Sequence, residues 1–96
     1  MYLAVKNVET QPNYHLIITF ANGERRLFDM NPYLDSGIFK ELTDINLFNS
    51  VRVSFDTIEW DNEADMDPEI LYIESTAIET QIASEPINKY GFEKQP

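Results

Sequence analysis

The residues best suited to carry chemistry are carboxylates crowded into residues 60–72, which read WDNEADMDPEILY. They are Asp61, Glu63, Asp65, Asp67 and Glu69. Carboxylates at alternating positions suit a hard cation such as calcium, and paired carboxylates can also serve as general acid and base. A calcium loop of the EF-hand type also needs glycine at its sixth position and glutamate at its twelfth. Met66 and Tyr72 stand there, so no metal site is predicted, and only weak metal candidates remain, namely Asp61, Asp65 and Asp67.

A structural role explains several of the same acids. Asp67 can cap a helix that begins at Pro68, and Glu69 in the first turn favours the positive end of the helix dipole. Asp61 and Glu63 are then solvated, and the stretch holds more acids than capping requires. That excess is the only functional signal inside the stretch.

Two aromatic residues, Trp60 and Tyr72, flank the acidic stretch. The simplest interpretation places both in the core or at its rim, where they hold the loop from either side. The alternative is an exposed aromatic pair in a binding site, because aromatic residues often anchor protein interfaces. The candidate partner-binding residues in this region are therefore Trp60, Glu63, Asp65 and Tyr72.

Several kinds of chemistry lack the residues that they need. The chain has no cysteine, which excludes disulfides, thiol nucleophiles and zinc–thiolate sites. His15 is the only histidine and no serine lies in a nucleophile-elbow context, so neither a hydrolytic triad nor a transition-metal site is expected. Three glycines cannot build a phosphate-cradling loop. We therefore expect no cofactor and no enzymatic activity.

The charge of the chain narrows the class of partner. The formal net charge is −10, with −1 in residues 1–54 and −9 in residues 55–96. Nucleic acids and anionic membranes require clustered lysine and arginine, so neither is an expected partner, whereas a basic protein is compatible. No signal peptide or membrane span is recognisable, so a cytoplasmic protein is expected.

The first half of the chain reads as β-structure. A strand with broken alternation covers residues 3–11, and two alternating segments within residues 15–30 flank Asn22–Gly23. This dipeptide favours a hairpin because both positions tolerate positive φ. The side chains expected on the core face are Leu16, Ile18, Phe20, Phe28 and Met30.

The middle of the chain changes to helical spacing. Residues 36–48 predict a short helix capped by Asp35 or Ser36, with a second turn that starts at Thr43–Asp44. A second hairpin over 51–60 is expected to turn at Asp56–Thr57. Its inward side chains are predicted to be Val51, Val53 and Phe55 on one strand and Ile58 and Trp60 on the other.

These segments predict an α+β fold in one small domain over residues 1–76. Antiparallel hairpins at about 3–30 and 51–60 surround the short central helix, and a second short helix lies near 68–75. Residues 77–96 form a C-terminal extension that is flexible or pairs as a strand with this or another chain. Its spaced apolar residues are further partner-binding candidates, namely Ile87, Tyr90 and Phe92.

Four segments carry a resemblance to a known family: FANGERRLFDMNPYL, GIFKELTDINLF, VRVSFDTIEW and ADMDPEILYIES. Over about residues 3–76, the pattern resembles small bacterial proteins catalogued as domain of unknown function 2442, whose fold is named after the N-terminal domain of a Nitrosomonas protein. The resemblance implies a compact α+β domain and brings no established catalytic residues. Glu63 stands where the family usually has glycine, so the turn after Trp60 is expected to differ in detail.

The resemblance also implies a class of function. Members of that family often look like partners of a second small protein encoded beside them, in an arrangement similar to toxin–antitoxin pairs. Together with the acidity, this favours a non-enzymatic protein-interaction module, antitoxin-like, that binds a small and basic protein. The alternatives are a divalent-cation-binding acidic loop and a structural homo-oligomer that pairs through a sheet edge.

Overall fold

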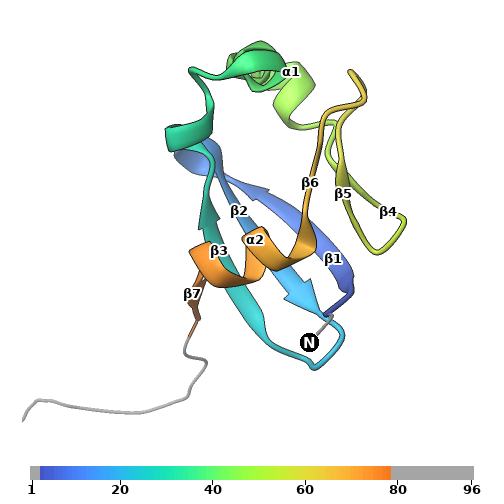
Figure 1. Ribbon diagram of the computed structural model, residues 1–96. Helices are drawn as coiled ribbons and strands as arrows, with labels where there is room; N and C mark the ends of the chain where they lie inside the picture. Colours follow the sequence, from blue (N-terminus) through green and yellow to red (C-terminus); the bar gives the residue numbers. More distant parts are fainter. Residues whose placement is uncertain (1–2, 79–96) are drawn as a thin grey trace, which may run out of the picture.

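The first three strands form consecutive hairpins in the computed structural model, which describes residues 3–78 (Figure 1). β1 (Val5–Gln11) pairs antiparallel with β2 (His15–Phe20), and β2 pairs with β3 (Arg25–Asp29). A short strand, β7 (Thr76–Ala77), pairs with the outer edge of β3 and gives the order β1-β2-β3-β7. The α+β class and the first hairpin unit are confirmed.

The broken alternation in β1 is a β-bulge. Val5 lies opposite Phe20 and Asn7 lies opposite Thr19, so one extra residue is accommodated on β1. The bulge lets both Val5 and Val8 pack on the core although they are three residues apart.

The turn between β2 and β3 is a three-residue loop, Ala21–Gly23. The backbone N–H of Phe20 donates to the Glu24 carbonyl at 2.9 Å, and that of Gly23 donates to the Phe20 carbonyl at 2.9 Å. In this loop only Gly23 has positive φ, +91°, and the Asn22 side chain accepts from the Glu24 N–H at 3.0 Å. The hairpin was predicted correctly, and of the two positions expected to tolerate positive φ only Gly23 adopts it.

Helical segments connect the strands. They are 3-10 helices at Pro12–Tyr14, Asn31–Tyr33 and Gly37–Thr43, then α1 (Ile45–Phe48) and α2 (Pro68–Glu74). Asp44 caps α1 by accepting from the Asn46 N–H at 3.0 Å, which confirms the predicted second turn. Ser36 holds the N-cap position of the preceding 3-10 helix without a side-chain hydrogen bond, so the predicted cap there was wrong.

A second sheet has the order β4-β5-β6, with β4 (Arg52–Ser54), β5 (Thr57–Glu59) and β6 (Asp65–Met66). β4 and β5 form the predicted second hairpin, but its turn is Phe55–Asp56, one residue earlier than expected. The pairing of β6 with β5 was not predicted, because two residues show no periodicity.

The earlier turn changes which side chains of this hairpin are buried. Ile58 and Trp60 are fully buried, as expected. Phe55 leaves the strand for the turn and is 96% exposed, and Val53 on the edge strand is 39% exposed. The prediction that both are buried was therefore wrong, because Phe55 lies in the turn and Val53 lies on the edge strand, whereas Val51, predicted with them, does pack against the core.

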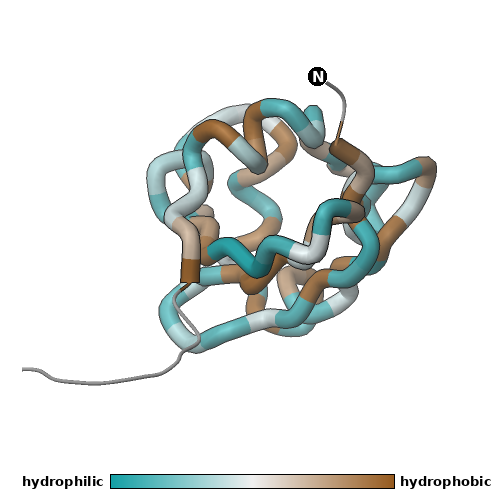
Figure 2. Tube along the Cα trace, turned by 90° about the horizontal axis from the view of Figure 1, so that it is seen from below, coloured by the Kyte–Doolittle hydropathy of each residue, from teal (hydrophilic) through white to brown (hydrophobic). Residues whose placement is uncertain are grey.

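One hydrophobic core joins the two sheets and α2. Its buried residues are Val5, Leu16, Ile18, Phe20, Phe28, Met30, Leu34, Leu42, Phe48, Ile58, Trp60, Ala64, Met66 and Leu71. α2 lies over the larger sheet in Figure 1, where the rings of Phe20 and Tyr72 meet edge to face with centroids 5.2 Å apart. Hydrophobic and hydrophilic residues are interspersed along the trace in Figure 2, and in β2 buried and partly exposed residues alternate. Among residues 3–78, no helix has the length and apolar character that a membrane span needs.

Candidate functional site

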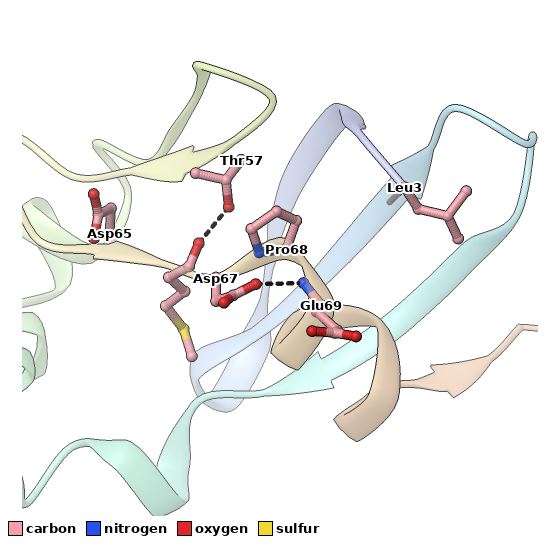
Figure 3. Close-up of a pocket in the computed structure, with 7 residues that line it drawn as sticks. Leu3, Thr57, Asp65, Asp67, Pro68 and Glu69 are labelled. Carbon is pink, nitrogen blue, oxygen red and sulfur yellow. Dashed lines mark hydrogen bonds between the residues drawn. The ribbon is translucent and has the colours of Figure 1, made fainter. Parts of the chain in front are cut away.

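An open groove of about 700 Å³ lies between the segment that leads into β1, the strand β6 and the start of α2 (Figure 3). Its lining combines apolar and acidic side chains, namely Leu3, Thr57, Asp65, Met66, Asp67, Pro68 and Glu69. Most of these residues come from the acidic stretch.

Local hydrogen bonds shape the groove. β6 pairs with β5 through Met66 opposite Ile58, and the Thr57 hydroxyl donates to the Met66 carbonyl. The Asp67 carboxylate accepts from the Glu69 N–H at 2.8 Å and caps α2, which confirms the predicted cap. The chain therefore passes from strand β6 to helix α2 within two residues. This short connection places Asp65, Asp67 and Glu69 along the groove (Figure 3).

A smaller hollow of about 210 Å³ continues the groove along α2. It is lined by Leu3, Pro68, Glu69, Tyr72 and Ile73, and it shares the first three of these residues with the groove. Ile73 is 68% exposed, so this end of the surface is apolar and open to solvent. Together the two hollows form one surface lined by apolar side chains and carboxylates, which we call the acidic groove.

The acidic groove lies in the most acidic part of the chain. Residues 55–78 contain eight acidic residues and no lysine or arginine. Arg52 compensates two acids outside the groove, with its guanidinium 2.8 Å from Asp61 and 3.7 Å from Glu59. Within the described part of the chain, no ion pair involves Asp65 or Glu69. These exposed carboxylates are therefore available to cations from outside.

The three weak metal candidates do not converge. Asp61 pairs with Arg52, Asp67 caps α2, and Asp65 lies on β6. Across residues 3–78, no group of three histidine, cysteine, aspartate or glutamate side chains could hold a metal ion. The alternating carboxylates therefore do not form a metal-coordinating cluster, because Asp61 and Asp67 are engaged by other groups.

Trp60 is a core residue and not part of an exposed aromatic pair. Its side chain is 0% exposed, and its indole N–H donates to the Phe48 carbonyl at 3.0 Å. The ring meets that of Phe39 edge to face, with centroids 6.3 Å apart. The candidate role of Trp60 in partner binding was therefore wrong, because a fully buried ring offers no surface to a partner.

Tyr72 is half-buried and belongs to a polar network at the hairpin tip. Its hydroxyl donates to Glu24 at 2.9 Å, and the Arg26 guanidinium lies over its ring, 4.3 Å from the centroid. Arg26 also donates to Glu24 at 2.9 Å and to the Ser75 hydroxyl at 2.7 Å. The Tyr72 hydrogen bond, with that of Arg26, lowers the pKa of Glu24, and the same bond to Glu24 raises the pKa of Tyr72. The network fixes α2 to the larger sheet.

Glu63 lies in the exposed turn before β6. The loop Asp61–Glu63 has the hydrogen bonds of a three-residue hairpin loop, with the Trp60 N–H 2.9 Å from the Ala64 carbonyl. Glu63 has φ of +71°, a conformation that glycine adopts without strain and other residues adopt rarely.

Sequence reasoning found only part of this site. It identified Asp65, Asp67 and Tyr72 as candidates, but it missed Leu3, Thr57 and Met66, whose places in the groove depend on tertiary packing and on the short strand β6. The C-terminal candidates Ile87, Tyr90 and Phe92 lie outside the described residues.

Comparison with known proteins adds a family. A family model described as "Protein of unknown function (DUF2442)" matches residues 5–77. The match covers both sheets and every residue of the groove lining except Leu3. No curated protein and no solved structure matches the chain.

Proposed function

The chain belongs to this family of proteins of unknown function, and from its acidic groove we propose that it is a non-enzymatic, antitoxin-like module that binds a small basic protein. The observation that carries the proposal is the lining of the groove. Apolar Leu3, Met66 and Pro68 line the same open groove as the carboxylates of Asp65, Asp67 and Glu69. Figure 3 shows the arrangement of the labelled residues of this lining.

Such a surface suits lysine and arginine side chains. Each has an apolar stem that can lie on apolar surface and a cationic head that can pair with a carboxylate. The eight acids of residues 55–78 also attract a basic protein over a distance of about 10 Å, which accelerates association. A partner that presents several basic residues along an extended segment would therefore fit.

Individual acids contribute differently to this proposal. Asp65 and Glu69 are exposed at the groove, and Glu63 is exposed in the turn before it, so we assign partner contacts to these three. Asp67 has a structural task, because its carboxylate caps α2. Tyr72 lines the adjoining hollow.

The proposal is tested by capture and reconstitution. The tagged full-length chain is exposed to a lysate of the source organism at low salt, retained proteins are identified by mass spectrometry, and each candidate is purified and titrated by calorimetry. The groove variant Asp65→Asn/Glu69→Gln should weaken binding of the true partner about five- to tenfold, since each exposed ion pair contributes up to about 1 kcal/mol.

A matched control separates a local effect from a general effect of charge. Glu9→Gln/Asp35→Asn removes the same two charges from exposed positions in the first half of the chain, and should leave the affinity within about twofold. Equal weakening by both double variants, or the absence of any basic partner, would reject the groove as the binding surface.

The C-terminal candidates need a separate variant. Tyr90→Ala/Phe92→Ala in the full-length chain should weaken binding more than Glu93→Gln, because buried aromatic anchors contribute more than rim charges. Equal and negligible effects would remove these residues from the proposed interface.

A further inference from the structure

We propose that Phe55, at the tip of the β4–β5 hairpin, is an anchor that inserts into an apolar pocket of the protein partner, with basic side chains at the rim of that pocket. This inference rests on the proposed function and deepens it by naming a residue and the chemistry of its receptor. Three features of the hairpin carry it: exposure, backbone conformation and surrounding charge.

Phe55 has almost no contact with its own chain. Its residue surface is 96% exposed, whereas Phe20, Phe28 and Phe48 are at most 1% exposed. Val53, two residues earlier, is 39% exposed and extends the apolar surface toward β4. A large aromatic residue in water adds little to the stability of this fold, and aromatic residues are enriched among the anchors of protein interfaces.

The backbone at this position disfavours phenylalanine. Phe55 has φ of +49° and Asp56 has φ of +67°, which is the pattern of a two-residue turn that glycine, asparagine and aspartate favour. A bulky residue with positive φ is uncommon because its Cβ crowds the backbone. Neither packing nor turn geometry therefore explains phenylalanine at position 55.

The hairpin presents the ring on a rigid support. The Val5 N–H donates to the Asp56 carbonyl at 2.8 Å, which ties the turn to the start of β1. Ser54 pairs with Thr57 directly below the turn. Because the backbone of the turn is already held in place, little backbone freedom is lost when the Phe55 side chain binds.

The acidic residues near Phe55 indicate that the pocket of the partner is surrounded by basic residues. Asp56 is exposed and follows Phe55 directly in the turn, and residues 55–78 contain eight acids and no lysine or arginine. A pocket rimmed by lysine or arginine matches these acids, whereas an anionic membrane would repel them. Thr57, which lines the acidic groove (Figure 3), follows Phe55 by two residues, so one partner can contact both.

Site-specific photo-crosslinking tests the proposal in the full-length chain. The photoreactive residue p-benzoylphenylalanine is introduced in living cells at position 55, at Ile73 in the acidic groove, and at Ile45 on α1 as an exposed control. We expect positions 55 and 73 to crosslink to one and the same basic protein, and position 45 to give no product. The peptide crosslinked to position 55 should contain apolar residues next to lysine or arginine.

The other outcomes are distinguishable. A product from position 73 alone would overturn the Phe55 anchor and leave the proposed function standing. A product from position 55 that contains only a second copy of this chain would overturn the inference, since the receptor would not be a basic partner. No product at either position would reject both.

A substitution provides the quantitative test. Phe55→Asn should fold with an unchanged or higher melting temperature, because asparagine tolerates positive φ, and should weaken binding of the crosslinked protein at least tenfold. Phe55→Tyr should retain affinity within about threefold. If Phe55→Asn binds as tightly as the native chain, the anchor is overturned, because the melting temperature shows that the variant is folded.

Discussion

The loops Ala21–Gly23 and Asp61–Glu63 share one backbone arrangement and differ at its most demanding position. In each, the N–H of the residue before the loop and the carbonyl of the residue after it are 2.9 Å apart. In each, the central asparagine accepts from a backbone N–H, at 3.0 Å in one loop and 3.1 Å in the other. The third residue has positive φ in both, but it is Gly23 in the first loop and Glu63 in the second.

The third residue of the first loop suits the positive φ of its position, whereas the third residue of the second loop does not. Gly23 adopts its conformation without strain, and the first loop leads into the polar network that fixes α2. Glu63 is an exposed acid at a position that favours glycine, in the acidic half of the chain. Departures from local consistency are expected where function acts on a residue, which agrees with the assignment of Glu63 to partner contact.

The largest expected effect concerns the aromatic residue that precedes each loop. Phe20 and Trp60 are both at most 1% exposed. Phe20→Ala and Trp60→Ala should each lower the free energy of unfolding by about 3–5 kcal/mol, because each leaves a large cavity. Urea unfolding measures both, and a loss below about 1 kcal/mol at either position would contradict the common role of the two rings.

Exchanging the third residues sharpens the comparison directly. Gly23→Glu should destabilise the chain by about 1–2 kcal/mol, the cost of a left-handed conformation for a residue with Cβ. Glu63→Gly should stabilise it by about 0.5–1 kcal/mol, because relief of strain exceeds the entropy that glycine loses on folding. Urea unfolding measures both changes in the free energy of unfolding. If Glu63→Gly destabilises the chain, the Glu63 side chain makes a contact whose contribution exceeds the cost of its strained backbone.

A smaller effect should appear at acidic pH. Glu24 follows the first loop, and its pKa is lowered by the hydrogen bond from Tyr72 and by Arg26. Its stabilising contribution is therefore fully present above the ordinary carboxyl pKa of 4.5, and is lost as pH falls through the lowered pKa of the folded state. The difference in melting temperature between the native chain and Glu24→Gln should shrink between pH 5 and the lowest pH at which both remain folded. If this difference in melting temperature does not change with pH, the charge of Glu24 is not what stabilises the native chain.

The smallest expected effect concerns divalent cations. Millimolar calcium or magnesium should leave the melting temperature unchanged, because Asp61 is engaged by Arg52 and Asp67 by the α2 cap. A rise of several degrees, lost in Asp65→Asn, would instead support the cation-binding alternative.

The sequence predicts best where local signals are strong. The alternation in β2 and β3 correctly gave the core face, and Asp67 before Pro68 correctly gave the capped start of α2. The burial of Phe55 was predicted wrongly, since a one-residue shift of a turn changes which side chains face the core. The acidic run placed Asp65 in the candidate site, but nothing local indicated that Leu3 lines the same groove.

Charge-driven recognition by the acidic groove is tested most directly by calorimetric titration of the captured partner at 50 and 300 mM salt. The native chain should lose affinity steeply as salt increases, and Asp65→Asn/Glu69→Gln should bind more weakly at low salt with a shallower dependence on salt. Charge-driven recognition by the acidic groove would be contradicted if the affinity of the native chain did not change with salt. It would also be contradicted if the groove variant had the same salt dependence as the native chain.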